Sequence, residues 1–433
     1  MVKIKDKNVF KLRKMLILSF IKILNKNDIH HIILENKKNF PNKILSDVDI
    51  YINFQDKKNL NKIVFKFLKK NKIFLSNVIR HEYNSFNYTF AFKLANNYYF
   101  FSIDICNDYV VNSKKLLSFS NVNFQSIIVN NIKINFLRDD YLFYYFLLKK
   151  IVKDDLNKDN KISLKKIFFK NKKKIIDRKI FSNKIKTYLI FFFKKNRSNS
   201  NYLSKLVKLD YINKKKINFY GEFLRYIDRL FSKTGMHIVF LGTDGAGKSS
   251  LISLLEKKFE KNISPFWFIE KYHLYNSLVN KKDKIVEPYI KPVYGKILSL
   301  VKAIYLYLVF LKFNLKNIFI KTRKSYLLIN DRYFHDVLID PSRYRINGYQ
   351  FLIRVFIFFL PKPDLCFLIK ASNKNIITRK KELTLKQIIY NQKKYNNYAK
   401  LKKNIFVINT DYKKEISVNK IIEKILYQLK KRY

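Results

Sequence analysis

Glycine, cysteine and acidic residues are scarce in this chain of 433 residues, which contains seven glycines, seven prolines, two cysteines and one tryptophan. The two cysteines, Cys106 and Cys366, are far apart, which excludes a disulfide-rich scaffold and a cysteine-based metal site. They are expected to be buried apolar side chains in a reducing compartment. Only 32 Asp and Glu residues stand against 89 Lys and Arg residues, so the formal net charge is +57.

This charge has two interpretations. Dense cations neutralise phosphates and favour a nucleic-acid partner. However, Lys, Asn, Ile, Phe and Tyr are enriched together while Gly, Ala and Pro are scarce, and the enriched types share AT-rich codons. Only 14 of the 89 basic residues are Arg, although Arg binds phosphates and bases better than Lys does. Genome bias is therefore the favoured explanation, and a nucleic-acid partner is the alternative.

Apolar residues make up 48% of the chain, enough for folded cores in two or three domains. Residues 15–24 predict an amphipathic helix and lack the features of a secretory signal. Residues 297–320 approach the length of a membrane span, but three lysines interrupt them. We expect a buried or partner-facing helix there, with peripheral contact to a membrane surface as the alternative. No transmembrane segment and a cytoplasmic location are expected; the oligomeric state is not determined.

Three regions differ in their patterns. Residues 1–137 alternate helical and strand signals and predict an α+β domain that ends in a hairpin at 127–134. Residues 138–233 carry apolar residues at helical spacing between lysine clusters and predict a helical connector. Residues 234–433 repeat strand, loop and helix, with strands expected at residues 237–241, 325–330, 365–370 and 405–409. This last pattern predicts an α/β domain with a doubly wound parallel sheet.

The glycines are concentrated at one place. The segment Gly242-Thr243-Asp244-Gly245-Ala246-Gly247-Lys248-Ser249 matches G-x-x-x-x-G-K-[ST] between an apolar strand and a helical pattern. Glycines let backbone N–H groups surround phosphate oxygens, and the N-terminus of the following helix attracts the same anion. The segment, extended by Ser250, therefore predicts an ATP site. Lys248 would reach the β- and γ-phosphates, and Ser249 would bind Mg²⁺.

A second group of candidate residues follows the strand expected at 325–330. Asp331 would lie beside the phosphate loop and hold Mg²⁺ directly or through water. Arg332 could bind a substrate phosphate through its forked guanidinium, although structural salt bridges would also explain it. Further on, Arg379 begins a basic cluster, residues 379–382, that could close over the nucleotide as a lid.

These motifs resemble the thymidylate kinase family of P-loop nucleoside monophosphate kinases, over roughly Gly235 to the C-terminus. The resemblance is closest to a bacterial thymidylate-kinase-like subgroup often encoded near surface-polysaccharide genes. It implies a transferase that uses ATP and Mg²⁺, with Asp244 contacting the acceptor sugar, Arg332 the acceptor phosphate and Arg379 in the lid. Leu241 replaces the usual Glu, and the Arg-Glu-Pro-Gly segment is missing. Phosphoryl transfer is thus better supported than thymidylate as its acceptor.

The N-terminal region has its own candidate site. Asp47 and Asp49 are two residues apart in a strand pattern and share one face, and Asp104 lies in another strand pattern. Three such carboxylates can hold two divalent metals for attack on a nucleotide α-phosphate. They resemble the nucleotidyltransferase superfamily, but residues 34–36 stand where its Gly-Ser pair is expected. An active transferase, a degenerate substrate-binding domain and an unrelated α+β domain remain open.

The combined expectation is an ATP-dependent P-loop kinase acting on a small acceptor, either a nucleotide or a sugar-linked metabolite. One alternative is an enzyme that processes nucleic-acid ends by nucleotidyl transfer and polynucleotide phosphorylation. Another is a non-catalytic nucleotide-binding scaffold.

Overall fold

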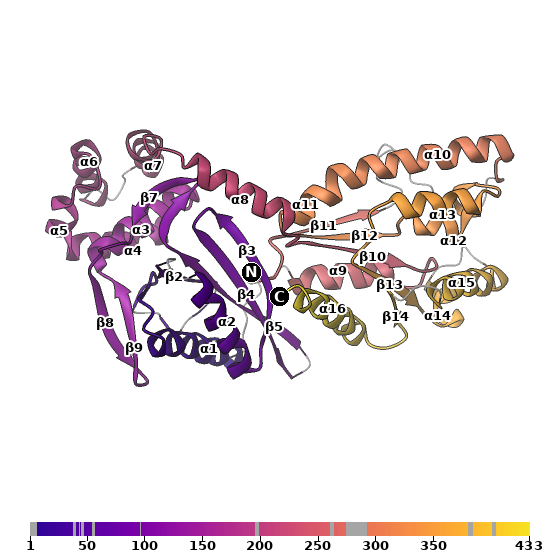
Figure 1. Ribbon diagram of the computed structural model, residues 1–433, viewed down its shortest axis with the longest axis horizontal. Helices are drawn as coiled ribbons and strands as arrows, with labels where there is room; N and C mark the ends of the chain where they lie inside the picture. The colour runs from indigo at the N-terminus through magenta and orange to yellow at the C-terminus, as the bar shows by residue number, and fades with distance from the viewer. Residues whose placement is uncertain are drawn as a thin grey trace.

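Two separate β-sheets organise the chain (Figure 1). The structure is a computed structural model that describes residues 7–37, 40–42, 44, 47–53, 57–95, 97–194, 199–259, 264–273, 292–379, 384–400 and 404–433. The first sheet has seven strands and the second has five, and a further pair of strands stands apart from both. The C-terminus lies where the two sheet-containing parts meet (Figure 1).

The N-terminal sheet is mixed, which agrees with the α+β expectation. Its strands, in spatial order, are β3 (Phe74–Glu82), β4 (Ser85–Leu94), β5 (Asn97–Cys106), β2 (Val48–Ile52), β1 (His31–Ile33), β9 (Ile132–Leu137) and β8 (Phe124–Val129). Helices α1 (Lys7–Lys26) and α2 (Lys57–Asn71) share one apolar core with this sheet. The hairpin expected at 127–134 is confirmed as β8–β9, where Asn130 and Asn131 adopt positive φ angles of 48° and 58°, as a tight turn requires.

A group of helices follows the sheet and packs on its other face. Tyr141, Phe143 and Leu147 of the first of these helices join Ile32 and Tyr51 in a second core cluster. The helices of this cluster are α3 (Asp139–Val152), α4 (Lys158–Lys170), α5 (Lys172–Asp177), α6 (Asn183–Lys194) and α7 (Ser200–Val207) with the π-helix η2 (Lys208–Ile212). Helix α8 (Phe219–Phe231) follows them and contacts β3 instead. The separate pair of strands is β6 (Asp108–Val111) and β7 (Lys114–Ser118).

The C-terminal sheet is entirely parallel, as the alternating pattern predicts. Its strands, in spatial order, are β11 (Phe268–His273), β12 (Tyr326–Asp331), β10 (Met236–Leu241), β13 (Leu365–Lys370) and β14 (Ile405–Asn409). The four expected strands are therefore confirmed, and β11 is an edge strand that the sequence pattern did not reveal. Strand β11 has the sequence Phe-Ile-Glu-Lys-Tyr-His, with two charged residues at its centre and no fully buried position. Among the described residues it pairs only with β12.

Helices cover both faces of this parallel sheet, which confirms the doubly wound α/β class. Helices α9 (Lys248–Phe259) and α16 (Lys414–Lys430) share one core cluster with the sheet. The opposite face is covered by α10 (Lys296–Phe313), η3 (Asn314–Phe319), α11 (Ile320–Arg323), α12 (His335–Ile339), η4 (Pro341–Tyr344), α13 (Gln350–Phe359) and α15 (Leu385–Lys400). Helix α14 (Asn373–Arg379) packs beside α15.

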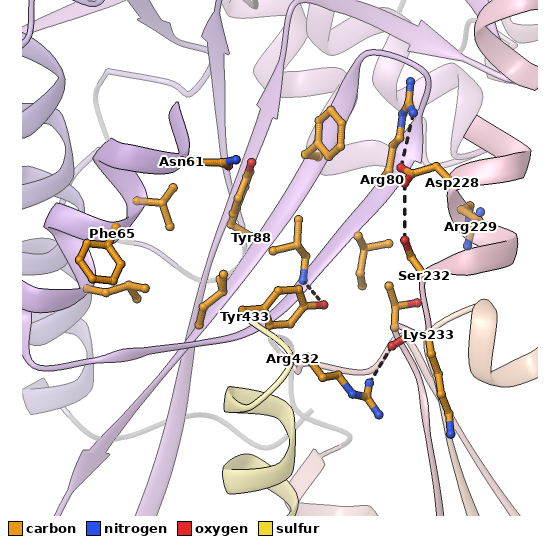
Figure 2. A pocket seen from close by; sticks show the side chains of 17 residues that line it. Asn61, Phe65, Arg80, Tyr88, Asp228, Arg229, Ser232, Lys233, Arg432 and Tyr433 are labelled. Atoms are coloured by element: carbon orange, nitrogen blue, oxygen red, sulfur yellow. Dashed lines mark hydrogen bonds and ion pairs between the residues drawn. The ribbon is translucent and has the colours of Figure 1, made fainter. Parts of the chain in front are cut away.

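The two parts of the chain meet along β3 and α8. Asn77 Nδ2 donates to Thr234 O at 2.9 Å, and the Tyr433 hydroxyl donates to Asn77 Oδ1 at 2.8 Å. A cavity of about 800 Å³ lies at this junction (Figure 2). Arg80 on its rim pairs with Asp228 at 3.4 Å, and Arg432 donates to Lys233 O at 2.8 Å. Within the protein, Arg80 is therefore neutralised by Asp228, and Arg432 is hydrogen-bonded to the backbone.

One helix differs from expectation in its environment. The continuous helix Lys296–Arg323 is long and apolar enough to cross a membrane, but only 28% of its most apolar window is buried. Of the two expectations for this segment, a buried helix is therefore wrong for most of its surface, and a partner-facing helix stays a prediction. The sheet occupies one side of α10, through Ala303, Leu306 and Phe310, and the other side has no protein cover among the described residues.

Candidate functional site

The loop between β10 and α9 owes its shape to three glycines. Their φ angles are 139° at Gly242, 80° at Gly245 and 96° at Gly247, values that residues with a Cβ rarely adopt. A Cβ at Gly242 would also clash with the carbonyl oxygen of Ile369 on the neighbouring strand. The backbone can therefore turn from β10 into α9 only with glycine here, as the motif requires.

Lys248 lies inside the curve of this loop. Its Nζ donates to the carbonyl oxygens of Gly242 and Thr243, both at 3.0 Å, and is 4.0 Å from Asp244 Oδ1. Burial and repulsion by the nearby arginines lower the pKa of Lys248 to about 8, although neighbouring carboxylates oppose this shift. The ammonium is thus held by its own loop, ready to exchange carbonyl partners for phosphate oxygens.

Oxygen ligands for a cation lie beside the loop. Asp331 ends β12 and pairs in register with Phe240 at the end of β10. Its Oδ1 is buried without a hydrogen-bond partner among the described residues, and its Oδ2 is 3.9 Å from His273 Nε2. An orphaned buried carboxylate oxygen is a suitable ligand for Mg²⁺. Ser249 and Ser250 are exposed in the first turn of α9, so the expected Mg²⁺ ligands fit this part of the structure.

Asp244 connects the loop to two arginines. Its Oδ1 accepts from Arg332 Nη2 at 2.7 Å, and its Oδ2 accepts from Arg343 Nη1. Burial would raise the pKa of Asp244, but these arginines and Lys248 outweigh it and hold the pKa well below its usual range. The sequence-predicted pair Asp244 and Arg332 therefore lies together, and Arg343 is a third member of the site that the motifs do not indicate.

A buried polar network fixes Arg332 from behind. Its Nη1 donates to both carboxylate oxygens of Asp336, at 3.0 and 2.8 Å, and to Tyr395 Oη at 2.7 Å. Tyr344 Oη also donates to Asp336, at 2.7 Å. Arg332 is only 2% exposed and has a positive φ of 73°. The structural salt bridges that the sequence analysis gave as an alternative role for Arg332 are therefore present. They orient Arg332 toward Asp244.

Arg379 approaches the loop from α14. Its Nη1 is 3.5 Å from Gly245 O and 3.4 Å from Thr410 Oγ1, and Thr410 donates to Ala246 O at 2.8 Å. Arg379 is exposed, so it is placed to reach a nucleotide. The rest of its predicted basic cluster, residues 380–382, lies outside the described residues.

The three N-terminal carboxylates also come together. Asp49 on β2 pairs in register with Asp104 on β5, and one ligand oxygen from each of Asp47, Asp49 and Asp104 lies within 4.8 Å of the others. Asp104 Oδ1 is buried without a partner among the described residues. Burial, Asp49 and Asp47 raise the pKa of Asp104 well above its usual range. This donor set fits a divalent cation.

Other charged groups at this cluster were not foreseen. Lys149 on α3 forms an ion pair with Asp49 Oδ2, which also accepts from Tyr145 Oη at 2.7 Å. Glu35 lies near them, and burial together with Asp49 raises its pKa to about 8. His81 Nε2 is 3.5 Å from Asp104 Oδ2. The sequence does not single out Lys149, because Lys150 follows it directly in the last turn of α3.

Of three comparisons with known proteins, only the one with solved structures finds matches. No family model and no curated protein matches the chain. Among solved structures, thymidylate kinase from Candida albicans is 18% identical with a TM-score of 0.33, covering 45% of this chain and 92% of that one. Thymidylate kinase from Ehrlichia chaffeensis is 17% identical with a TM-score of 0.30, covering 44% of this chain and 98% of that one. The sheet order and the phosphate loop themselves define the class: this is a P-loop α/β protein.

Proposed function

We propose that this protein is an ATP-dependent phosphotransferase that moves the γ-phosphoryl group to a small acceptor. The observation that carries the proposal is the curved loop with Lys248 inside it, next to the orphaned carboxylate oxygen of Asp331. The acceptor is a nucleoside monophosphate or a phosphorylated, sugar-linked metabolite. The protein would act in the cytoplasm as a P-loop kinase fused to a nucleotidyltransferase-like domain, with domains at 1–137, 138–233 and 234–433.

Each residue has a defined part in this proposal. Backbone N–H groups of residues 242–250 surround the triphosphate, and Lys248 reaches its β- and γ-phosphates. Ser249 and Asp331 would hold Mg²⁺, which neutralises charge on the phosphate oxygens. An acceptor oxygen forms a bond to the γ-phosphorus as the bond to the β–γ bridging oxygen breaks, and ADP leaves with that electron pair. Catalysis is positioning and charge stabilisation, with no covalent enzyme intermediate.

The acceptor side is formed by Asp244 and the arginines around it. Arg332 and Arg343 place two positive charges at one carboxylate, so an acceptor phosphate entering here would exchange places with Asp244 on one of them. Asp244 would then be released toward the acceptor hydroxyls. Arg379 approaches the loop near Gly245 O and would stabilise charge on the transferring group.

Labelled ATP tests this proposal with a panel of acceptors that includes thymidylate, other nucleoside monophosphates and sugar phosphates. We expect γ-label on one acceptor class and about a thousandfold loss of turnover in Lys248→Ala. Lys257→Ala, an exposed lysine on the same helix, is the matched control and should behave as the wild type. Full turnover in Lys248→Ala would refute the assignment, and ATP binding without transfer to any acceptor would favour the scaffold alternative.

A second activity, nucleotidyl transfer by the N-terminal part, is supported by the convergence of Asp47, Asp49 and Asp104. The ion pair of Lys149 with Asp49 already compensates one of these charges, so we expect a single bound cation. Transfer of label from the α-phosphate of a nucleotide should survive Lys248→Ala and disappear in Asp104→Asn. If α-label is never transferred by the wild type, even to an RNA end, this part serves only to bind a substrate.

A further inference from the structure

Helix α8 exposes most of its apolar residues, whereas its charged residues are only partly exposed and most of them are paired within the protein. All seven of its exposed positions are aromatic or leucine, namely Phe219, Tyr220, Phe223, Leu224, Tyr226, Leu230 and Phe231. By contrast, Glu222 pairs with Arg225, and Asp228 pairs with Arg80 of the sheet. A helix that faces water normally has the opposite arrangement. No described residue of the protein covers the exposed apolar side of α8.

The continuous helix α10–η3–α11 repeats this pattern. Twelve of its positions are exposed, of which nine are apolar or aromatic and three are lysines. The apolar positions are Ile297, Leu298, Val301, Ile304, Tyr305, Leu308, Leu315, Phe319 and Ile320. Their spacing of three, four and seven residues places them mainly along one side, opposite the face that packs on the sheet.

The helices that carry these exposed residues are neighbours. Helices α8, α11 and α10 follow one another along the upper edge of Figure 1, and Arg323 Nε of α11 donates to Leu230 O of α8 at 2.6 Å. Helix α13 lies beside α10, with the rings of Phe356 and Tyr307 stacked at 4.3 Å. It adds Phe351, Phe358 and Phe359, all exposed. We call the exposed residues of α8, α10–η3–α11 and α13 the apolar strip.

The charges on the apolar strip decide between two occupants. Its exposed charged residues are Lys296, Lys312, Lys316 and Arg354, and no exposed residue of these helices is acidic. A second copy of this chain would bring the same cations face to face with no carboxylate on the strip to pair with them. A bilayer that contains anionic lipids offers both an apolar layer for the aromatic residues and phosphates for the lysines.

We propose that the apolar strip docks the protein on the surface of an anionic lipid bilayer. The helices would lie in the plane of the headgroups with the strip facing the acyl chains. The helix Lys296–Arg323 would not cross the membrane, because Ala303, Leu306 and Phe310 on its other side are packed into the protein core. This inference concerns a surface distinct from the nucleotide site and does not depend on the proposed phosphotransferase activity.

Sedimentation of the full-length chain with lipid vesicles tests the proposal. We expect binding to vesicles of phosphatidylcholine mixed with phosphatidylglycerol, and weaker binding to phosphatidylcholine alone. Phe223→Ser combined with Leu308→Ser should weaken binding to both vesicles by about tenfold or more, because two apolar side chains leave the bilayer. Lys312→Gln combined with Lys316→Gln should lose about tenfold on the anionic vesicles only.

The matched control lies on the opposite face of the parallel sheet. Tyr427 and Lys430 of α16 are exposed there, so Tyr427→Ser combined with Lys430→Gln should bind vesicles like the wild type. Circular dichroism and unfolding midpoints identify any variant that is misfolded. Two results would overturn the proposal: equal loss of binding in the control, or a wild-type chain that ignores vesicles. A dimer in sedimentation velocity that Phe223→Ser with Leu308→Ser dissociates would instead assign the strip to a second copy.

Discussion

Replacing Gly242 by Ala tests the phosphate loop through its backbone. The φ angle of 139° at this position is strained for any residue with a Cβ, and the added methyl group would meet Ile369 O. The strain costs about 1–3 kcal/mol, and the overpacking adds a further 1–3 kcal/mol. We therefore expect a loss of about 3 kcal/mol or more in the free energy of unfolding of the C-terminal part, with weakened ATP binding.

Substitutions at two other glycines distinguish the cost of backbone strain from the cost of overpacking. Gly348 has a φ of 81° but no atom within 4 Å of a Cβ, so Gly348→Ala should lose about 1 kcal/mol from strain, partly offset in the unfolded chain. Gly295 has a φ of −58° and equally open surroundings. Gly295→Ala should change stability by less than about 0.5 kcal/mol, because the gain from a less flexible unfolded chain and the loss of an N-cap residue nearly cancel.

Urea unfolding measures this series, with Trp267, the only tryptophan of the chain, as the fluorescent probe. Its backbone N–H donates to Ser325 O at 3.0 Å at the edge of the C-terminal sheet, so it reports on that sheet. ATP affinity by calorimetry is the second readout. The reasoning is refuted if Gly242→Ala unfolds at the wild-type urea concentration and binds ATP normally, or if Gly348→Ala is as damaging as Gly242→Ala.

Two further predictions concern buried charges. ATP should bind more weakly as the pH rises above 8, because Lys248 has a pKa of about 8 in the free protein and must be protonated to bind phosphate. Calorimetry should show a loss of ATP affinity of up to about tenfold between pH 8 and 9. A constant affinity would contradict this role of Lys248. Lys149→Met should destabilise the N-terminal part by about 3–5 kcal/mol at pH 7, because Asp49 would remain buried and charged without its partner. In this variant the pKa of Asp49 would be raised rather than lowered. The loss in the free energy of unfolding should therefore become smaller as the pH falls and Asp49 takes up a proton. Urea midpoints at pH 7 and 5 measure this, Lys150→Met is the control on the same helix, and a deficit that does not depend on pH would count against the ion pair.

Local sequence predicted much of the backbone. The glycine spacing placed the phosphate loop at residues 242–249, and short apolar runs placed four of the five parallel strands. The paired Asn130 and Asn131 placed a hairpin turn that only residues tolerant of positive φ can form. Each of these features depends on neighbours within a few residues, so the pattern itself contains the physical cause. Strand β11 was missed because its half-exposed edge carries no continuous apolar run.

Only the tertiary structure shows which charged residues pair with one another. Asp244 and Arg343 are separated by 99 residues and Asp49 and Lys149 by 100, and no spacing rule connects them. Packing also decided which side of α8 and α10 remains exposed, because apolar residues occur on both sides of α10 and the core can cover only one. The sequence by itself thus determined where a phosphate could bind. The fold determined which charges surround it and which apolar surface is left uncovered, since burial and long-range electrostatics arise only when distant segments meet.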